Sequence, residues 1–263
     1  MTSPLSSRVR KALVAVADAK KAPQMQAYMK SSMRYHGVTA PVLKATIREV
    51  FADYAPRNAK AWRADVLELW QNAKFREERY AAIALSGHHA ARPFQTLEAL
   101  PMYEEMIVSG AWWDYVDALA ESRVGGLLLS YPKEMRKTML AWSKCPDMWK
   151  RRVSIICQLK RREETDLELL YACIEPSIDS KEFFLRKAIG WALREVAWTN
   201  PEETIRYVKE NEDRLSGLSQ REALKNVQKI MSGAKKKRVT APRARPRTPE
   251  TPRETSSRRR ART

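Results

Sequence analysis

The stretch WKRRVSIICQLKRREETDLELLYACIEPSIDSKEFFLRKAIGWAL, residues 149–193, contains two copies of one pattern. Arg151-Arg152-Val153 in its first half aligns with Arg186-Lys187-Ala188 in its second half, 35 residues later. Around each triplet, apolar residues recur at intervals of three and four, which is typical of an amphipathic helix. The stretch therefore predicts two similar helices, one in each of two successive structural units.

The same triplet recurs along most of the chain. Its first residues are separated by 36, 36, 36, 35 and 35 positions. The six triplets are Leu43-Lys44-Ala45, Arg79-Tyr80-Ala81, Tyr115-Val116-Asp117, Arg151-Arg152-Val153, Arg186-Lys187-Ala188 and Arg221-Glu222-Ala223. A period of this length is that of a helix–turn–helix repeat, and six stacked units form a solenoid with a concave inner surface. Arg fills the first position in four of the six triplets, so we expect this position to line one face with positive charge.

The spacing of apolar residues favours an all-α fold throughout. It predicts helices over Leu5–Ala19, Val42–Tyr54, Trp62–Trp70, Tyr80–Ala90, Met135–Trp142, Trp149–Leu159 and Phe183–Val196. Prolines stand where new helices are expected to begin, at Pro23, Pro41, Pro56, Pro93, Pro132, Pro146 and Pro201. We therefore predict an α-solenoid of about six helix pairs, related to HEAT repeats.

Charge divides the chain into two parts. The formal net charge is +18, which calls for a polyanionic partner. Residues 233–263 hold 12 Lys and Arg but only two Glu, together with many Pro, Thr and Ser, and we expect them to form a disordered basic tail. The tail either attracts phosphates or only improves solubility. Residues 1–232, the predicted repeat domain, are basic in their own right, with 37 Lys and Arg against 29 acidic residues.

Composition also excludes several classes of protein. No stretch is apolar over the roughly 18 residues that a membrane span needs, and the N-terminus lacks a signal-peptide core. We expect a cytoplasmic protein that associates with the nucleoid and not with membranes. The three cysteines are scattered and only three histidines are present, so we predict no metal and no cofactor. Nothing in the sequence indicates oligomerisation, and we expect a monomer.

Asp117 breaks the repeat pattern. The third position of the triplet holds Ala or Val in the other five units, as tight packing between helices would require. A carboxylate at such a position loses solvation unless a partner compensates it, and local rules are often broken at functional sites. Trp113 stands four residues earlier and so on the same helical face. The alternative is that Asp117 only caps a helix or pairs with a neighbouring Arg.

Two longer motifs resemble a known family. They are Ala111-Trp112-Trp113-Asp114-Tyr115-Val116-Asp117 and the segment KEFFLRKAIGWALRE at residues 181–195, which is followed by Thr199-Asn200-Pro201. Both are similar to the AlkD family of alkylpurine DNA glycosylases, over about residues 8–231. The resemblance implies a HEAT-like solenoid that holds DNA in its concave face, in agreement with the repeat.

The resemblance also implies roles for individual residues. Asp117 matches the catalytic carboxylate, and Trp113 and Trp191 match the aromatic pair that packs against the deoxyribose of the lesion. Arg152 matches an active-site Arg near a backbone phosphate, and Tyr28 matches a tyrosine on the opposite side of the duplex. For further contacts with DNA we expect Arg151, Lys187 and Arg194. The family has Gln where this chain has Thr39, which puts contacts near the first repeat in doubt.

These residues suit the excision of purines that already carry a positive charge. An N3- or N7-alkylated purine leaves without protonation, so only the oxocarbenium ion that forms on the sugar needs stabilisation. A fixed carboxylate stabilises this ion electrostatically, and aromatic faces attract the same cation. The resemblance implies that the base is not flipped into a pocket. The expected substrate is therefore double-stranded DNA containing 3-methyladenine or 7-methylguanine.

Two other functions fit parts of the sequence. The first is a non-catalytic HEAT-repeat scaffold that binds DNA or protein, and the second is a basic repeat protein that binds RNA or the ribosome. A helix-hairpin-helix glycosylase finds no support in 8 Gly and 3 Cys.

Overall fold

The computed structural model describes the backbone of residues 4–240 and the side chains as far as Gly233. The described chain is helical throughout, apart from turns and one isolated β-bridge between Arg34 and Phe75. Its α-helices are α1 (Pro4–Ala15), α2 (Ala22–Tyr28), α3 (Ala40–Val50), α4 (Ala59–Gln71), α5 (Arg76–Ser86), α6 (Leu100–Gly110), α7 (Trp113–Leu119), α8 (Gly125–Ser130), α9 (Pro132–Ser143), α10 (Met148–Ile156), α11 (Leu167–Ile174), α12 (Phe183–Ala197), α13 (Pro201–Glu210), α14 (Gly217–Leu224) and α15 (Val227–Thr240). The predicted all-α fold is confirmed.

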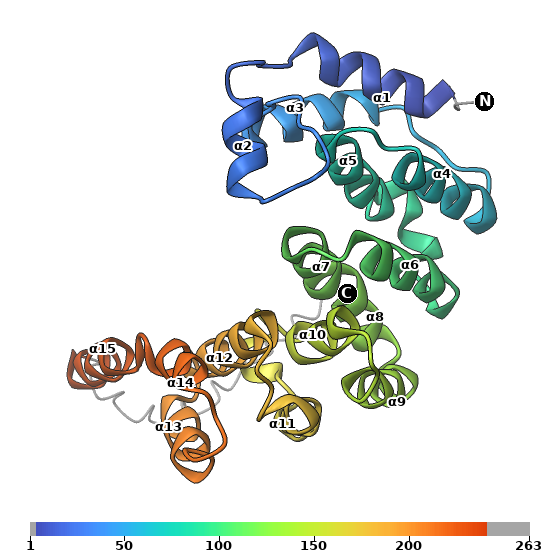
Figure 1. Ribbon diagram of the computed structural model, residues 1–263. Coiled ribbons are helices and arrows are strands. Elements are labelled where there is room, and N and C mark those ends of the chain that lie inside the picture. The colour runs from blue at the N-terminus through green and yellow to red at the C-terminus, as the bar shows by residue number, and fades with distance from the viewer. Residues whose placement is uncertain (1–3, 241–263) are drawn as a thin grey trace, which may run out of the picture.

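The helices form a curved stack of two layers (Figure 1). Helices α5, α7, α10 and α12 follow the inner side of the curve, whereas α4, α6, α9, α11 and α13 lie on its outer side. Helix α2 stands at the upper end of the opening, and α14 and α15 stand at its lower end (Figure 1). The arrangement is an α-solenoid with an open concave side, as the repeat predicted.

Each repeat triplet lies on one helix of the inner layer. In chain order these helices are α3, α5, α7, α10, α12 and α14, and each contacts the next. The third residue of the triplet packs between helices, since Ala81, Val153, Ala188 and Ala223 are fully buried. Ala45, in the first unit, is exposed. The near-constant period therefore places equivalent residues at equivalent points along the concave surface.

Large aromatic residues fill the core between the layers. Trp62, Trp70, Tyr103 and Tyr115 are fully buried. Their polar atoms are mostly paired: Trp70 Nε1 donates to Ser109 Oγ at 2.9 Å, and Trp62 Nε1 donates to a backbone carbonyl. Burial of an aromatic side chain contributes about 1.5–3 kcal/mol. The core thus fixes the outer helices against the inner ones that carry the triplets.

A buried carboxylate holds the segment that follows α2. Glu77, at the start of α5, is inaccessible to solvent and accepts hydrogen bonds from the backbone N–H groups of His36, Gly37 and Val38 at 2.9–3.1 Å. Gly37 has φ +83°, and a Cβ there would lie 2.0 Å from the carbonyl oxygen of Asp18, so only glycine fits. This clamp fixes α2 against the first repeat.

Several predicted helix boundaries are wrong. The helix expected over Val42–Tyr54 ends at Val50, and the one expected over Tyr80–Ala90 runs from Arg76 to Ser86. The first helix ends at Ala15 and not at Ala19, because a turn leads into α2 at Ala22. Helix α15 runs to Thr240 and so includes the start of the basic tail expected from Gly233. Ala, Lys and Arg in this stretch are good helix formers, so the helix extends into the basic run. The rest of the predicted tail, residues 241–263, lies outside the described residues.

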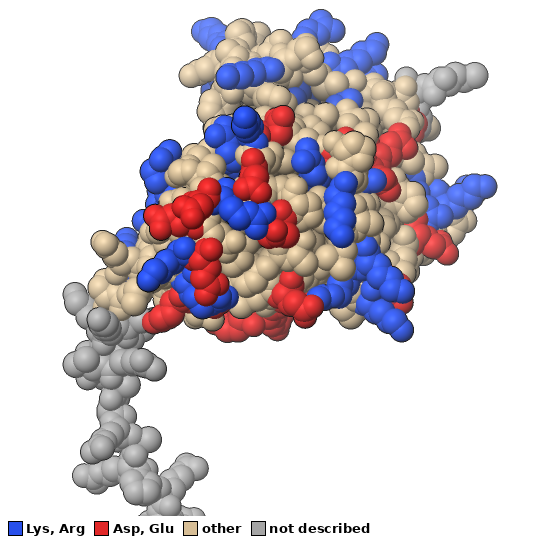
Figure 2. All heavy atoms as spheres, turned by 60° about the horizontal axis from the view of Figure 1, so that its bottom comes forward, with Lys and Arg blue, Asp and Glu red and all other residues tan. Residues whose placement is uncertain are grey.

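Opposite charges alternate on the outer side of the solenoid. Figure 2 brings the bottom of Figure 1 forward and shows acidic and basic side chains interspersed over this face. Several form ion pairs, among them Arg136–Asp166 at 2.6 Å, Arg206–Glu203 at 2.6 Å and Arg214–Glu175 at 2.9 Å. None of the helices in the described residues is long and apolar enough to span a membrane.

Candidate functional site

A cleft of about 390 Å³ opens on the concave side. Four helices of the inner layer and α2 contribute to it. Its lining residues are Tyr28 on α2, Trp113 on α7, Arg152 on α10, Phe183, Phe184, Lys187, Trp191 and Arg194 on α12, and Glu222 on α14. The structure thus brings together six residues that the sequence predicted for one site: Tyr28, Trp113, Arg152, Lys187, Trp191 and Arg194.

The position of Trp113 follows from a sharp turn before α7. Ala111 is left-handed, with φ 42°, and Trp112 is extended, so α7 begins at Trp113. The left-handed conformation costs an alanine about 1–2 kcal/mol. Asp117 lies one turn further along the same helix and on the same face. The turn therefore directs both side chains toward the inner side of the solenoid.

Asp117 forms an ion pair with Arg152. Nε and Nη2 of Arg152 donate to the two carboxylate oxygens of Asp117, each at 2.7 Å. The side chain of Asp117 is 15% exposed and that of Arg152 is 5% exposed. Burial raises the pKa of Asp117, and the hydrogen bonds from Arg152 oppose this rise. Asp117 is therefore neither sealed in the core nor freely solvated, and its pairing favours the ionised carboxylate.

Arg152 has a positioning contact in addition to the ion pair. Its Nη1 donates to the backbone carbonyl of Phe184 at 2.6 Å. The guanidinium thereby joins the helices of three successive repeats, α7, α10 and α12. Three of the five N–H groups of Arg152 are used in these contacts, so the expected contact with a phosphate has to use the other two. Asp117 thus pairs with an Arg, as one of the alternatives expected, and through Arg152 the pair reaches the cleft.

Asp114, a second carboxylate on α7, also pairs with a buried arginine. Arg76 Nη2 donates to both oxygens of Asp114 at 2.6 and 2.7 Å, and Tyr80 donates its hydroxyl to Asp114 at 2.6 Å. Arg76 also donates to Ser31 Oγ at 3.2 Å, which connects this network to the segment after α2. Neither Asp114 nor Asp117 is among the lining residues of the cleft, but Arg152, the partner of Asp117, lines it, whereas Arg76, the partner of Asp114, does not. Two Asp–Arg pairs of similar geometry thus stand three residues apart, one at the cleft and one beside it.

Aromatic side chains pack next to the cleft. The ring of Phe184, which lines it, lies 5.5 Å from Trp112 and 5.0 Å from Trp149. Trp149 is buried and Trp112 is partly buried. Of the two adjacent tryptophans, Trp112 therefore supports the site by packing, and Trp113 faces the cleft.

The two predicted cations on α12 share one carboxylate. Lys187 Nζ and Arg194 Nη1 donate to opposite oxygens of Glu222, at 2.8 and 2.5 Å. Hydrogen bonding with Lys187 lowers the pKa of Glu222, which is therefore charged at neutral pH. Sequence reasoning missed Glu222 as a site residue. The signal was present, because Glu222 follows Lys187 by one repeat period.

The arginines at the first position of the triplet do not line the cleft. Arg79, Arg151 and Arg186 are half-buried, their Nε atoms are buried without a hydrogen-bond partner in the described protein, and none lines the cleft. The second position faces the concave side instead, as Arg152, Lys187 and Glu222 do. One residue rotates a helix by about 100°, so adjacent positions point in different directions. Among the predicted DNA contacts, Arg151 is thus the one outside the cleft.

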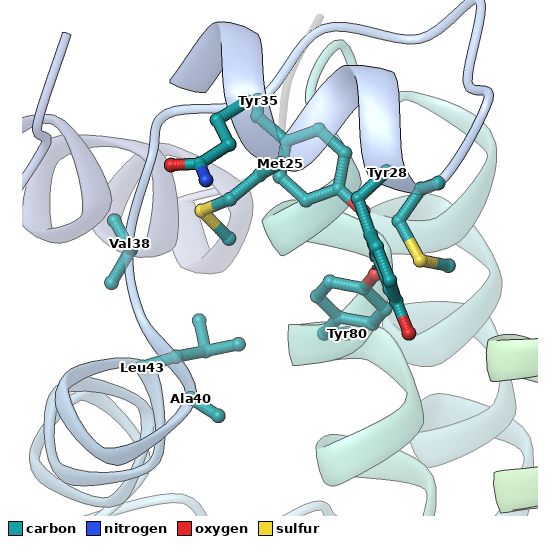
Figure 3. Close-up of a pocket in the computed structure, with 9 residues that line it drawn as sticks. Met25, Tyr28, Tyr35, Val38, Ala40, Leu43 and Tyr80 are labelled. Atoms are coloured by element: carbon teal, nitrogen blue, oxygen red, sulfur yellow. Dashed lines mark hydrogen bonds between the residues drawn. The ribbon is translucent and has the colours of Figure 1, made fainter. Parts of the chain in front are cut away.

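Tyr28 stands between the cleft and an apolar pocket of about 510 Å³. Its side chain is highly exposed. In Figure 3 the rings of Tyr28 and Tyr80 lie on one side of this pocket, and Val38 and Leu43 lie on the other. The Tyr28 pocket therefore extends the concave surface from the cleft toward the first repeats.

Comparisons with known proteins point to one family. The model of a family described as "DNA alkylation repair enzyme" matches residues 9–227. Among solved structures, a "predicted DNA alkylation repair enzyme" from Enterococcus faecalis is similar, with a TM-score of 0.73 and 29% sequence identity, over 81% of this chain and 97% of that one. The search of curated proteins found no match.

Proposed function

This chain belongs to the family of DNA alkylation repair enzymes, and from that premise we propose that it is a glycosylase of the AlkD type. It hydrolyses the N-glycosidic bond of cationic N3- or N7-alkylated purines, such as 3-methyladenine and 7-methylguanine, in duplex DNA. The observation that carries the proposal is the Asp117–Arg152 pair at a cleft lined by Trp113 and Trp191.

The proposed reaction places charge where Asp117 stabilises it. The bond between the sugar C1′ and the purine nitrogen breaks, and its electron pair neutralises the cationic base. The sugar becomes an oxocarbenium ion, which a fixed carboxylate stabilises in a partly desolvated site. Water then adds to C1′, and its proton passes to Asp117 and on to solvent. No acid is needed to protonate the base, in keeping with a cleft that presents no histidine among its described lining residues.

The remaining residues of the cleft bind and orient the nucleotide. The faces of Trp113 and Trp191 attract the sugar cation by about 0.5–2 kcal/mol each. Arg152 fixes the rotamer of Asp117 and offers its remaining N–H groups to a phosphate. Lys187 and Arg194 approach the backbone from α12, and Tyr28 contacts the duplex from the opposite side of the opening. Because the chemistry occurs at the sugar, the base need not leave the helical stack.

The catalytic unit proposed here is the repeat domain, residues 1–232, acting as a monomer on double-stranded DNA. A second candidate is a DNA-binding scaffold without catalysis. It is favoured by the engagement of both Asp117 oxygens with Arg152. A carboxylate has about four lone-pair positions, however, so two remain for water or the sugar.

The test uses a duplex with a single 7-methylguanine, incubated with excess protein. Release of the free base and formation of an abasic site are measured by chromatography and by alkaline strand cleavage. Release by the native protein and its loss in Asp117→Asn, with DNA binding retained, is the expected result. Binding without release of base by the native protein refutes the glycosylase proposal and selects the scaffold.

A further inference from the structure

A second, polar pocket lies beyond the end of α5. It measures about 230 Å³ and is lined by Arg92 and Arg123, by His88 and His89, and by the hydroxyls of Ser122 and Ser130. None of its lining residues in the described protein is acidic. A space of this size holds a phosphate group with its hydration. Two arginines and two hydroxyls without a carboxylate form a donor set suited to an oxyanion.

Arg123 projects from a distortion of the helix that follows α7. Residues Ala120–Val124 form a π-turn (η3) between α7 and α8, and such turns are frequent at functional sites. Nε of Arg123 donates to Ser86 Oγ at 3.0 Å and Nη2 donates to the carbonyl of Ile83 at 3.2 Å. Its Nη1 has no hydrogen-bond partner in the described part of the protein, so a donor remains for a ligand.

Gly87 makes room for this guanidinium. A Cβ at Gly87 would lie 1.9 Å from Cζ of Arg123, so any other residue moves the Arg123 side chain. Burial lowers the pKa of Arg123, because the cation loses solvation, and the nearby phenol of Tyr103 opposes this only in part. A desolvated cation with neutral partners is unfavourable unless an anion joins it.

Capping of α5 explains only part of this arrangement. Arg123 donates to a carbonyl in the last turn of α5, which is a known role for basic side chains. That role requires neither the second arginine, Arg92, nor the two serine hydroxyls across the pocket. It also leaves Nη1 unused.

The pocket adjoins a series of hollows that share lining residues and lead from the cleft. Tyr28 lines both the cleft and the Tyr28 pocket. Leu43 and Tyr80 line both the Tyr28 pocket and a third hollow of about 550 Å³ between α3 and α5. His88 and His89 line both this third hollow and the Arg123 pocket. A ligand that extends from the cleft through these hollows therefore reaches the pocket lined by Arg123.

We propose that the Arg123 pocket binds a phosphate of the DNA backbone away from the lesion, and so fixes the register of the duplex relative to Asp117. This inference rests on the proposed function only in that the ligand is DNA. The bound group is a phosphodiester, whose single negative charge is shared by two non-bridging oxygens that Arg92 and Arg123 can bind, and it needs no recognition of the base.

The test measures how binding of an undamaged duplex depends on salt. Each phosphate contact contributes about 0.9 to the slope of log K against log salt. We expect Arg123→Ala to lower the slope by about this amount, so that the variant loses about 3.5-fold less affinity than the native protein between about 50 and 200 mM salt. Arg92→Ala should change the slope in the same direction. Arg57→Ala, an equal change of charge at an exposed residue between α3 and α4, should keep the native slope.

A variant that keeps the charge of Arg123 but moves its side chain distinguishes direct contact with a phosphate from general electrostatic attraction. Gly87→Ala displaces the Arg123 guanidinium through its flexible end, so the protein should fold normally while the slope falls. This variant and Arg92→Ala decide the question if Arg123→Ala proves unstable. Native slopes in Gly87→Ala and Arg92→Ala overturn the proposal.

Titration with inorganic phosphate distinguishes the source of the ligand. Binding that Arg123→Ala abolishes, together with unchanged DNA slopes, would show that the pocket takes a free phosphate and would overturn the assignment to DNA. Because the duplex is undamaged, none of these results depends on excision. A protein with the expected slopes that releases no base contradicts the glycosylase proposal alone.

Discussion

The two aspartates of α7 provide a matched test of the site. Asp117 and Asp114 are 15% and 12% exposed, and each receives two hydrogen bonds of 2.6–2.7 Å from one buried arginine. Replacing either aspartate by Asn leaves a buried guanidinium without its counter-charge. We expect both changes to destabilise the fold by about 3–5 kcal/mol, which thermal unfolding will measure. Only the Asp117 pair reaches the cleft, through Arg152, so only Asp117→Asn should remove catalysis.

The expected loss of excision rate in Asp117→Asn follows from the charge that Asp117 supplies. Two opposite unit charges about 4 Å apart attract by about 4 kcal/mol at an effective dielectric constant near 20. Losing this stabilisation of the oxocarbenium ion slows excision about 1,000-fold. The expected loss of folding free energy is a large part of the total stability of a domain, which is about 5–15 kcal/mol. The assay is therefore run at low temperature on protein shown to be folded.

The assay is single-turnover release of 7-methylguanine with protein in excess, beside fluorescence anisotropy of DNA binding. Asp114→Asn should keep a rate constant within several-fold of the native one per folded molecule. Two results refute the reasoning. One is a folded, DNA-bound Asp117→Asn that excises at the native rate, and the other is an equal loss of activity in Asp114→Asn.

Three further predictions concern the cleft and the first repeats. Trp191→Ala should slow excision about 2- to 30-fold, because it removes about 0.5–2 kcal/mol of attraction to the sugar cation; an unchanged single-turnover rate would exclude this role. Glu222→Gln should raise affinity for duplex DNA and steepen the salt slope by about 0.9 for each cation released, Lys187 included, and weaker binding in an anisotropy titration would contradict this. Burial alone would raise the pKa of Glu78, but its contacts with His36 and Arg10 lower it to about 2. This depressed pKa contributes on the order of 3 kcal/mol above the ordinary pKa of Glu, and the contribution is lost as pH falls toward 2. Urea unfolding at pH 6 and pH 3 should therefore show a loss of unfolding free energy at the lower pH that is absent in Glu78→Gln.

The sequence by itself determined the solenoid and its most unusual residue. Helical spacing and a period of 35–36 residues are visible in the sequence without any knowledge of contacts. Each repeat places its triplet on one helix of the inner layer. Within that frame Asp117 is recognisable as the one acid among small apolar residues. The resemblance in the two motifs then added Trp113 and Trp191, which the structure places at the same cleft.

Helices without a clear apolar face were harder to predict. The spacing of apolar residues did not predict helix α6. Its sequence is rich in apolar residues, and its buried residues include Met102, Tyr103, Met106 and Ile107. A helix that is apolar on most sides has little periodicity to detect. The short helix α8 was missed as well, and the π-turn before it left no signal in the sequence.

Only the tertiary structure decided which charges meet. Arg152 pairs with Asp117, Arg76 with Asp114, and Glu222 with both Lys187 and Arg194, across 28–38 residues of sequence. A repeat period identifies the helix on which a residue lies, but the rotation of that helix against its neighbour decides which side chains touch. Since one position along a helix changes direction by about 100°, the packing of successive repeats turned Arg152 toward Asp117 and left the adjacent Arg151 outside the cleft.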